Sequence, residues 1–370
     1  MRRIAAILFG LTLFTGALGC GTTEIEGNAG NQVAVHETEA EKSWKSEDGY
    51  LRKADKVSQG NSVFGENNTE FTLSVPTCVK KIDNTWFIVD CYHDQIIYND
   101  NCSAPLGEWK VLTKDVKQPH TIAGDGNVLL VDDTENNRVM VFEKKDEVYE
   151  NTQIFDDIGK RPHYTEYDEE EQAFYVLSSA TGEIYVFRHE DDNTEMYLSE
   201  IRRVGCENVE PGVYEMVDNA STLNGIYIRS FYLEGDYIYF VSGIKSDGTS
   251  SGIIKCDKRS LDIVEQYPVS DEIAGMAALR RDGDYFYITV STDVAGSQDA
   301  ATMLRVKDLG DLSEGKYEEI YSAYFVGGGT PYNMNYIDGR IYLTEHRVPG
   351  HSIWSYKVEN NEVTDVEALY

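Results

Sequence analysis

Short apolar runs separated by polar turns fill the chain from about residue 61 to its end. The stretch "PHTIAGDGNVLLVDDTENNRVMVF", which begins at Pro119, shows the pattern: an apolar run, a Gly turn, the buried run "NVLLVDD", a polar Asp/Asn loop and another alternating run. Alternation with a period of two is typical of β-strands, and helical periodicity is nearly absent. We therefore predict an all-β domain over residues 61–370.

The pattern repeats six times. Pro76, Pro119 and Pro162 are spaced by 43 residues, and each opens a copy. The first turns of the six copies fall at Asn84, Gly126, Glu171, Gly235, Gly283 and Gly339. A unit of about 40–50 residues with four strands has the size of a propeller blade. The repeats predict a six-bladed β-propeller; an insertion around 189–226 leaves seven blades as the alternative. The stretch "TEFTLS" before the first copy is expected to close the ring as an outer strand.

The copy that begins at Pro119 resembles NHL repeats, and the last copy, "YIDGRIYLTEHRVPGHSIWSYKVE", resembles a YWTD-type blade. The resemblance implies that the first strand of each blade lines a central channel. The residue after the proline is then the one to compare between copies, and Met276 takes that position in the fifth copy. The resulting candidates for ligand binding are Thr77, His120, His163, Arg229, Tyr332 and the adjacent Asn333.

The chain begins "MRRIAAILFGLTLFTGALGC", two arginines ahead of a short apolar run. This arrangement predicts a signal peptide over residues 1–19. The cleavage region "ALGC" resembles the lipobox of bacterial lipoproteins, which implies a lipidated Cys20. Residues 20–60 are too polar to bury a core and are expected to form a disordered acidic tether. We predict a bacterial protein held at the extracytoplasmic face of the cell membrane through its lipid alone.

Charge and cysteine content restrict the partners. Sixty-four acidic and 33 basic residues give a net charge of −31, which disfavours nucleic acid and anionic membrane surfaces. We expect a monomer that binds a protein, peptide or saccharide at one face of the ring. Besides Cys20, the chain has an odd number of cysteines, which excludes a disulfide framework as the basis of the fold. A local Cys91–Cys102 bridge and isolated thiols both stay open. The five are Cys78, Cys91, Cys102, Cys206 and Cys256.

Two histidines at the same place in neighbouring copies are the sharpest chemical signal. The stretch "PHT" is similar to a Pro-His-Ser stretch of peptidyl-amidating lyases, NHL-like propellers with a catalytic zinc in the channel. The similarity implies a divalent metal, zinc or calcium, on His120 and His163, although zinc needs a third ligand that the sequence does not supply. The alternative is a polar pair that hydrogen-bonds water and backbone. Arg229 beside it predicts a positive patch suited to a carboxylate or another anion.

Acid and amide residues suggest a second metal chemistry. Six-bladed lactonases use a Glu/Asn/Asn/Asp set around a divalent metal, and fragments of such a set are present at Glu345, Asn333, Asn335, Asp90 and Asp132. The loop with Asp133, Asn136 and Asn137 lacks the spacing of an EF-hand. We expect its side chains to cap turn backbone rather than bind calcium.

The leading functional hypothesis is a tethered propeller that binds a ligand or protein and catalyses no reaction. Its rivals are a metal-dependent lyase or lactonase in the channel and an adhesion module of the cell envelope. Fold alone does not separate them, because propellers carry out all three functions.

Overall fold

The computed structural model describes residues 51–53, 55–56, 65–146, 148–190, 193–204, 226–245, 252–325, 329–346 and 351–370. The chain divides into two compact units, 1–34 and 35–370, and every described residue belongs to the second. The predicted signal peptide, Cys20, Cys206 and most of the predicted tether lie outside the described residues. Within the ranges given above, no helix is long and apolar enough to cross a membrane.

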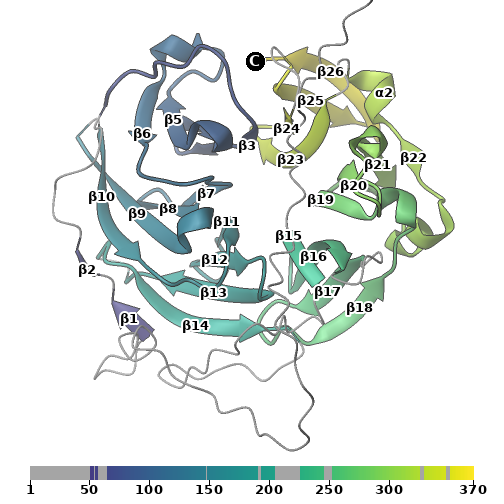
Figure 1. Ribbon diagram of the computed structural model, residues 1–370, viewed down its shortest axis with the longest axis horizontal. Coiled ribbons are helices and arrows are strands. Elements are labelled where there is room, and N and C mark those ends of the chain that lie inside the picture. Colours follow the sequence, from purple (N-terminus) through teal and green to yellow (C-terminus); the bar gives the residue numbers. More distant parts are fainter. Residues whose placement is uncertain are drawn as a thin grey trace, which may run out of the picture. The chain divides into compact units, whose positions relative to one another are not determined.

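Six antiparallel sheets of consecutive strands form a six-bladed β-propeller (Figure 1). The first three blades contain β3 (Pro76–Ile82), β4 (Thr85–Asp90), β5 (Gln95–Asn99) and β6 (Lys110–Thr113); β7 (Ile122–Gly124), β8 (Val128–Asp133), β9 (Arg138–Lys145) and β10 (Val148–Phe155); and β11 (Pro162–Asp168), β12 (Ala173–Ser178), β13 (Glu183–Arg188) and β14 (Tyr197–Arg203). The last three contain β15 (Ile226–Glu234), β16 (Tyr237–Lys245), β17 (Ile253–Asp257) and β18 (Ile263–Tyr267); β19 (Gly275–Asp282), β20 (Tyr285–Thr292), β21 (Thr302–Val306) and β22 (Glu318–Glu319); and β23 (Thr330–Ile337), β24 (Arg340–His346), β25 (Ile353–Glu359) and β26 (Glu362–Ala368). One short helix, α2 (Tyr321–Tyr324), follows β22.

The six predicted repeats are confirmed as six blades. Each predicted first turn lies between the first two strands of its blade. Asp338 and Gly339 show why such residues stand there, because both have positive φ, as a type I′ hairpin requires. The alternative of seven blades is wrong, since β14 completes the third sheet and β15 opens the fourth.

The core lies between the blades. Strands β4, β8 and β12 are buried at every position, because sheets pack against both of their faces. The buried apolar residues form one cluster for each pair of neighbouring blades, the pair of first and last blades included. The first strands are thereby fixed around the centre of the ring (Figure 1).

The ring closes without the predicted strand from "TEFTLS". That stretch, residues 69–74, forms no strand. Asn67, two residues before it, makes an isolated bridge to Lys110 of the first blade, and the last blade has four strands of its own. Tyr370 makes the closing contacts instead. Its carbonyl accepts from the backbone N–H of Ile353, and its hydroxyl lies 2.6 Å from the carbonyl oxygen of Cys102 in the first blade. Trp109 Nε1 also donates to this hydroxyl, over 3.1 Å.

Two short strands lie within the range predicted as tether. Strand β1 (Leu51–Lys53) pairs with β14, and β2 (Asp55–Lys56) pairs with β10. Each adds a fifth strand at the outer edge of a blade, which leaves the inner strands unchanged.

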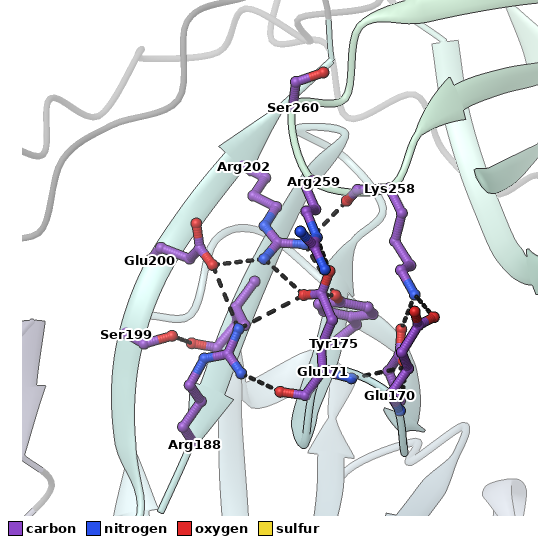
Figure 2. Close-up of polar contacts among 12 residues, drawn as sticks. Glu170, Glu171, Tyr175, Arg188, Ser199, Glu200, Arg202, Lys258, Arg259 and Ser260 are labelled. Carbon is purple, nitrogen blue, oxygen red and sulfur yellow. Dashed lines mark hydrogen bonds and ion pairs between the residues drawn. The ribbon is translucent and has the colours of Figure 1, made fainter. Parts of the chain in front are cut away.

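A cluster of ion pairs joins the third and fourth blades (Figure 2). Glu171, in the β11–β12 turn, accepts from Arg202 of β14 over 3.1 Å and from Arg259, in the β17–β18 turn, over 2.9 Å. Tyr175 donates to the same carboxylate over 2.5 Å. Although burial opposes it, these donors lower the pKa of Glu171 to about 2. The cluster therefore holds an ionised carboxylate between the two blades.

The described cysteines are free thiols and buried, so the local bridge between Cys91 and Cys102 does not form. Burial raises the pKa of Cys78, Cys102 and Cys256 to about 12. These thiols stay protonated at neutral pH and are poor nucleophiles.

Candidate functional site

A β-bulge recurs near the start of the first strand in five of the six blades. The pairing register shifts between Pro76 and Cys78, Pro162 and Tyr164, Ile228 and Ser230, Met276 and Ala278, and Pro331 and Met334. A bulge turns the side chain of its extra residue out of the regular alternation and is common beside functional sites. In the second blade β7 begins only at Ile122, so His120 precedes the paired region.

Side chains of the second strand support this irregular backbone. The carboxylate of Asp132 accepts the backbone N–H groups of His120 (2.7 Å) and Thr121 (2.9 Å), together with the Thr121 hydroxyl. In the last blade the hydroxyl of Thr344 accepts the N–H of Asn333 over 3.2 Å. These bonds satisfy backbone N–H groups that lie outside the strand ladder, and they fix the residues beside them.

Five blades line a small cavity of about 10 Å³ at the centre of the ring, which is room for about one water molecule. The residues at or beside the bulges supply its walls. They are His120, Thr121, His163, Tyr164, Arg229, Ser230, Ala277, Tyr332 and Asn333.

Five of the six sequence candidates thus come together, and the sixth does not. Thr77 is buried in the first blade, where its hydroxyl lies 3.4 Å from the carbonyl oxygen of Pro119 in the next blade. The prediction that Met276 holds the channel-facing position in the fifth blade is wrong by one residue. Met276 lies in the apolar cluster between the fourth and fifth blades, and Ala277 faces the cavity.

The two histidines stack face to face, with ring centroids 3.8 Å apart. The Nδ1 atom of His163 lies 2.8 Å from the carbonyl oxygen of Arg229, which can only accept, so this nitrogen carries the proton. The Nδ1 atom of His120 lies 2.8 Å from Oγ1 of Thr134, whose own hydrogen is donated to the carbonyl of Pro162 over 2.7 Å. Both rings are therefore Nδ1–H tautomers, and each keeps a lone pair on Nε2.

Both histidines are neutral at physiological pH. Burial and the positive charges of Arg161 and Arg229 lower the pKa of His163 to about 3. The pKa of His120 lies well below its usual value, first because the ring is buried and then because His163 stands beside it. The pair consequently offers hydrogen-bond acceptors rather than positive charge.

Tyr332 completes the wall around the histidines. Its hydroxyl lies 3.4 Å from Nε2 of His163, and its ring stacks on His346 with centroids 4.5 Å apart. Burial raises the pKa of Tyr332 well above its usual value, so the hydroxyl keeps its proton. Tyr332 therefore supplies a donor at the same point where the histidines supply acceptors.

Arg229 is the cationic group of the cavity. Its Nη1 atom donates to the hydroxyl of Ser291. Among the arginines whose side chains the structure describes, Arg229 and Arg280 alone have no partner among the carboxylates that it describes. The paired ones are Arg138, Arg161, Arg188, Arg202, Arg203, Arg259, Arg281, Arg305 and Arg340.

An ion pair joins first strands at another level of the ring. Nζ of Lys80, on β3, lies 2.6 Å from the carboxylate of Glu166 on β11 and 3.4 Å from Oδ1 of Asn335 on β23. The amide nitrogen of Asn335 lies 3.6 Å from Sγ of Cys78. Asn335 is thus engaged by neighbouring blades and does not line the cavity.

The acid and amide residues suggested for a lactonase-type metal set are dispersed. Asp90 accepts from the backbone of Ser74 and contacts His93, while Asp132 supports the segment with His120. Burial raises the pKa of Asp132 to about 7 and that of Glu345 above its usual value. Within the described ranges, no group of three or more His, Cys, Asp and Glu side chains can hold a metal ion.

The histidine pair has no geometry for a shared zinc ion. Because the rings are stacked, the Nε2 lone pairs run side by side and do not converge on one point. The predicted metal on His120 and His163 thus finds no third ligand in the described part of the chain.

The polar loop after β8 caps backbone, as predicted. Asp133 accepts the N–H of Lys117 over 2.6 Å, and Asn137 accepts that of Arg161 over 2.8 Å. Sequence reasoning did not identify Thr134 and Ser291 as partners of the site. Both residues lie at the ends of second strands, opposite the candidate residues of the first strands. A comparison of these positions in the sequence would have identified them.

Comparison with known proteins identifies the fold and no family. No family model matches the sequence, and no curated protein matches it. Among solved structures, a proposed 6-phosphogluconolactonase from Bacteroides fragilis is 14% identical over 85% of this chain and 92% of that chain, with a TM-score of 0.51. A second protein with this description, from Bacteroides uniformis, is 15% identical over 76% of this chain and 80% of that chain, with a TM-score of 0.50. At such identities the likeness concerns the propeller fold alone.

Proposed function

We propose that the protein is a membrane-tethered, extracytoplasmic β-propeller that binds a ligand at the centre of one ring face and does not transform it. One observation carries the proposal: neutral His120 and His163, Tyr332, and Arg229, which has no carboxylate partner among the described residues, converge on one small hollow at the centre of the ring. Binding sites are concave and hold a few polar groups that set orientation, and this cavity has both properties.

The cellular location within this proposal rests on the start of the sequence. A basic and apolar leader followed by "ALGC" supports export and lipidation of Cys20. The high negative charge supports an exposed, monomeric protein. The ligand in this proposal is a protein, a peptide or a saccharide, or a small part of one.

A lactonase or lyase in the same cavity is the second candidate. The observation that favours it is the pair of unprotonated Nε2 atoms beside Arg229, since an imidazole lone pair can accept a proton from a reacting group. The low pKa of His163 argues against a strong base at neutral pH. The proposed lactonases named above share the fold, which by itself supports no reaction here.

Native mass spectrometry of the full chain, incubated with a metabolite and envelope extract, tests the proposal. We expect the protein to retain a ligand that a His120→Ala/His163→Ala variant loses. A Cys256→Ala variant, altered in the apolar layer between blades, is the control and should retain the ligand. Failure to retain any ligand would contradict the binding function, and saturable turnover of a lactone would replace it with the enzymatic one.

A further inference from the structure

We propose that the outer edge of the fourth blade is a docking site for an extended peptide of a partner protein, which pairs with β18 as a fifth strand. The peptide that fits this edge alternates apolar and basic residues. The site lies at the rim of the ring and goes beyond the ligand proposed for its centre, so the two proposals can fail separately. The inference follows from the strands that two other blades already accept, from the exposure of β18 and from its charge.

Two outer edges of the ring already carry an added strand (Figure 1). In the second blade β2 pairs with Gln153 and Ile154 of β10, and in the third β1 pairs with Tyr197 and Leu198 of β14. Both outer strands contain a bulge, and the added strand pairs directly beside it. An added strand satisfies the outward N–H and C=O groups of an edge, which is how many proteins recognise extended peptides. The outer edges of this propeller can therefore bind an extended segment.

Strand β18 has the same form, and no strand within the described ranges pairs with its outer edge. It has five residues, and its pairing with β17 shifts between Lys255 and Cys256, which makes Val264 the bulged residue. The remaining edges differ from it. Asn67 bridges to β6, β22 has only two residues, and β26 contains Asp365, whose positive φ interrupts the extended backbone. Strand β18 is thus the edge best suited to accept a further strand.

The side chains of β18 face water. Ile263 and Val264 are 41% and 52% exposed, and every residue from 262 to 266 is exposed. Among the large apolar side chains that the structure describes as exposed, these two alone lie on an outer strand. Proteins normally shorten, charge or cover such an edge, because an apolar edge strand pairs readily with another chain. The exposed pair therefore marks a surface that a partner strand covers.

The charge of this edge selects the partner. Asp262 and Glu265 are exposed carboxylates on either side of the two apolar residues, and residues 261–270 include no Lys or Arg. Strand β1, which binds the neighbouring blade, has the sequence LRK and shows the chemistry that an edge of this ring accepts. Basic residues of a peptide would lie opposite the carboxylates, and β-branched residues would contact Ile263 and Val264. The net charge of −31 adds attraction for a basic segment.

Two peptides of equal charge test whether docking needs a strand. KVKVKV, with blocked ends, alternates basic and β-branched residues, whereas KVKPKV has the same charge and a proline without an N–H to pair with the edge. Binding of each labelled peptide to the full chain is followed by fluorescence anisotropy. KVKVKV should bind at least about tenfold more tightly, because proline removes a backbone hydrogen bond and disrupts the pairing around it. Equal affinity would show attraction by charge alone and would overturn the inference, as would a lack of binding by KVKVKV.

The variant Val264→Lys assigns the contact to β18. It replaces an apolar contact by a charge that repels the lysines of the peptide, and it should weaken the binding of KVKVKV at least about tenfold. Ala295→Lys is the matched control, because it adds the same charge at an exposed position between β20 and β21. Its affinity should stay within about twofold of wild type. Equal effects of the two variants, or no effect of Val264→Lys, overturn the assignment.

Hydrogen exchange of the full chain locates the contact. KVKVKV should slow exchange in residues 262–267 and leave β10 and β14 unchanged, because β2 and β1 take their edges. Protection elsewhere without protection of β18 overturns the inference. Protection of β18 before peptide is added overturns it as well, because the chain's own tether or a second copy then holds the edge, and sedimentation separates these two. The ligand at the ring centre is tested independently, by its retention in the mass spectrum.

Discussion

Replacing Glu171 by Gln should destabilise the propeller more than any other single isosteric change in the ionic cluster of Figure 2. The substitution keeps the shape of the side chain and removes its charge. Glu171 and Arg202 are only 6% and 4% exposed, so the guanidinium loses a counter-ion that water cannot replace. Glu200 also bonds Arg202, over 2.6 Å, but is 25% exposed, and Glu200→Gln is therefore the matched control.

The magnitude of the loss follows from the burial of this ion pair. Removing one partner of a buried ion pair costs roughly 3–5 kcal/mol, and the remaining bond of Arg202 to Glu200 argues for the lower end. The pKa of Glu171, lowered from 4.5 to about 2, points in the same direction, because the folded state favours the ionised carboxylate. We expect a loss of about 3 kcal/mol for Glu171→Gln and at most about 1 kcal/mol for Glu200→Gln.

Urea unfolding of the full chain, followed by circular dichroism, measures both values. A depressed pKa contributes stability that is complete above about pH 4.5 and is lost as the pH falls towards 2. The difference between wild type and Glu171→Gln should therefore be full at pH 7 and should shrink at pH 3.5. Equal losses for the two variants at pH 7, or a difference that does not depend on pH, would refute the reasoning.

Three further predictions concern other contacts. The bond to Asp125 raises the pKa of His189 to about 9, so the pair should stabilise the fold fully below about pH 6.5 and progressively less up to pH 9; a His189→Gln variant should lose this slope in urea unfolding. Tyr370→Phe removes the hydroxyl between the last and first blades and should lower the free energy of unfolding by about 1–2 kcal/mol; no change would exclude a role in ring closure. Cys20→Ser should shift the protein from the membrane to the soluble fraction after cell fractionation, and continued membrane association would contradict lipid anchoring.

The number and spacing of the blades were predictable because they depend on local sequence. Five of the six first turns place Gly, Asn or Asp next to an apolar run, and the regular spacing of Pro76, Pro119 and Pro162 sets the register of the first three blades. Where no proline marks the start of a blade, as in the fifth, the register was assigned one residue early, at Met276 instead of Ala277.

The site was predictable as a set of positions but not as chemistry. His120, His163, Arg229 and Tyr332 follow from comparing equivalent places in the repeats. Their protonation and charge balance depend on partners from other blades, such as the carbonyl of Arg229, 66 residues from His163. No local pattern reveals such pairs.

The long-range contacts could likewise not be predicted from the sequence. Arg259 and Glu171 are 88 residues apart, and the closing bond of Tyr370 to Cys102 spans 268 residues. Each arises because blade packing brings together turns or chain ends that carry no mutual signal. The prediction of a closing strand from "TEFTLS" was wrong for the same reason, since Tyr370 at the chain end makes the closing contact instead.

Ligand retention by two arginine variants tests the central claim most directly. The full chain, Arg229→Gln and Arg280→Gln are incubated with the same extract and weighed by native mass spectrometry. Binding at the centre of the ring predicts that wild type and Arg280→Gln keep the same small ligand and that Arg229→Gln loses it. Retention of that ligand by Arg229→Gln at wild-type occupancy would contradict the account.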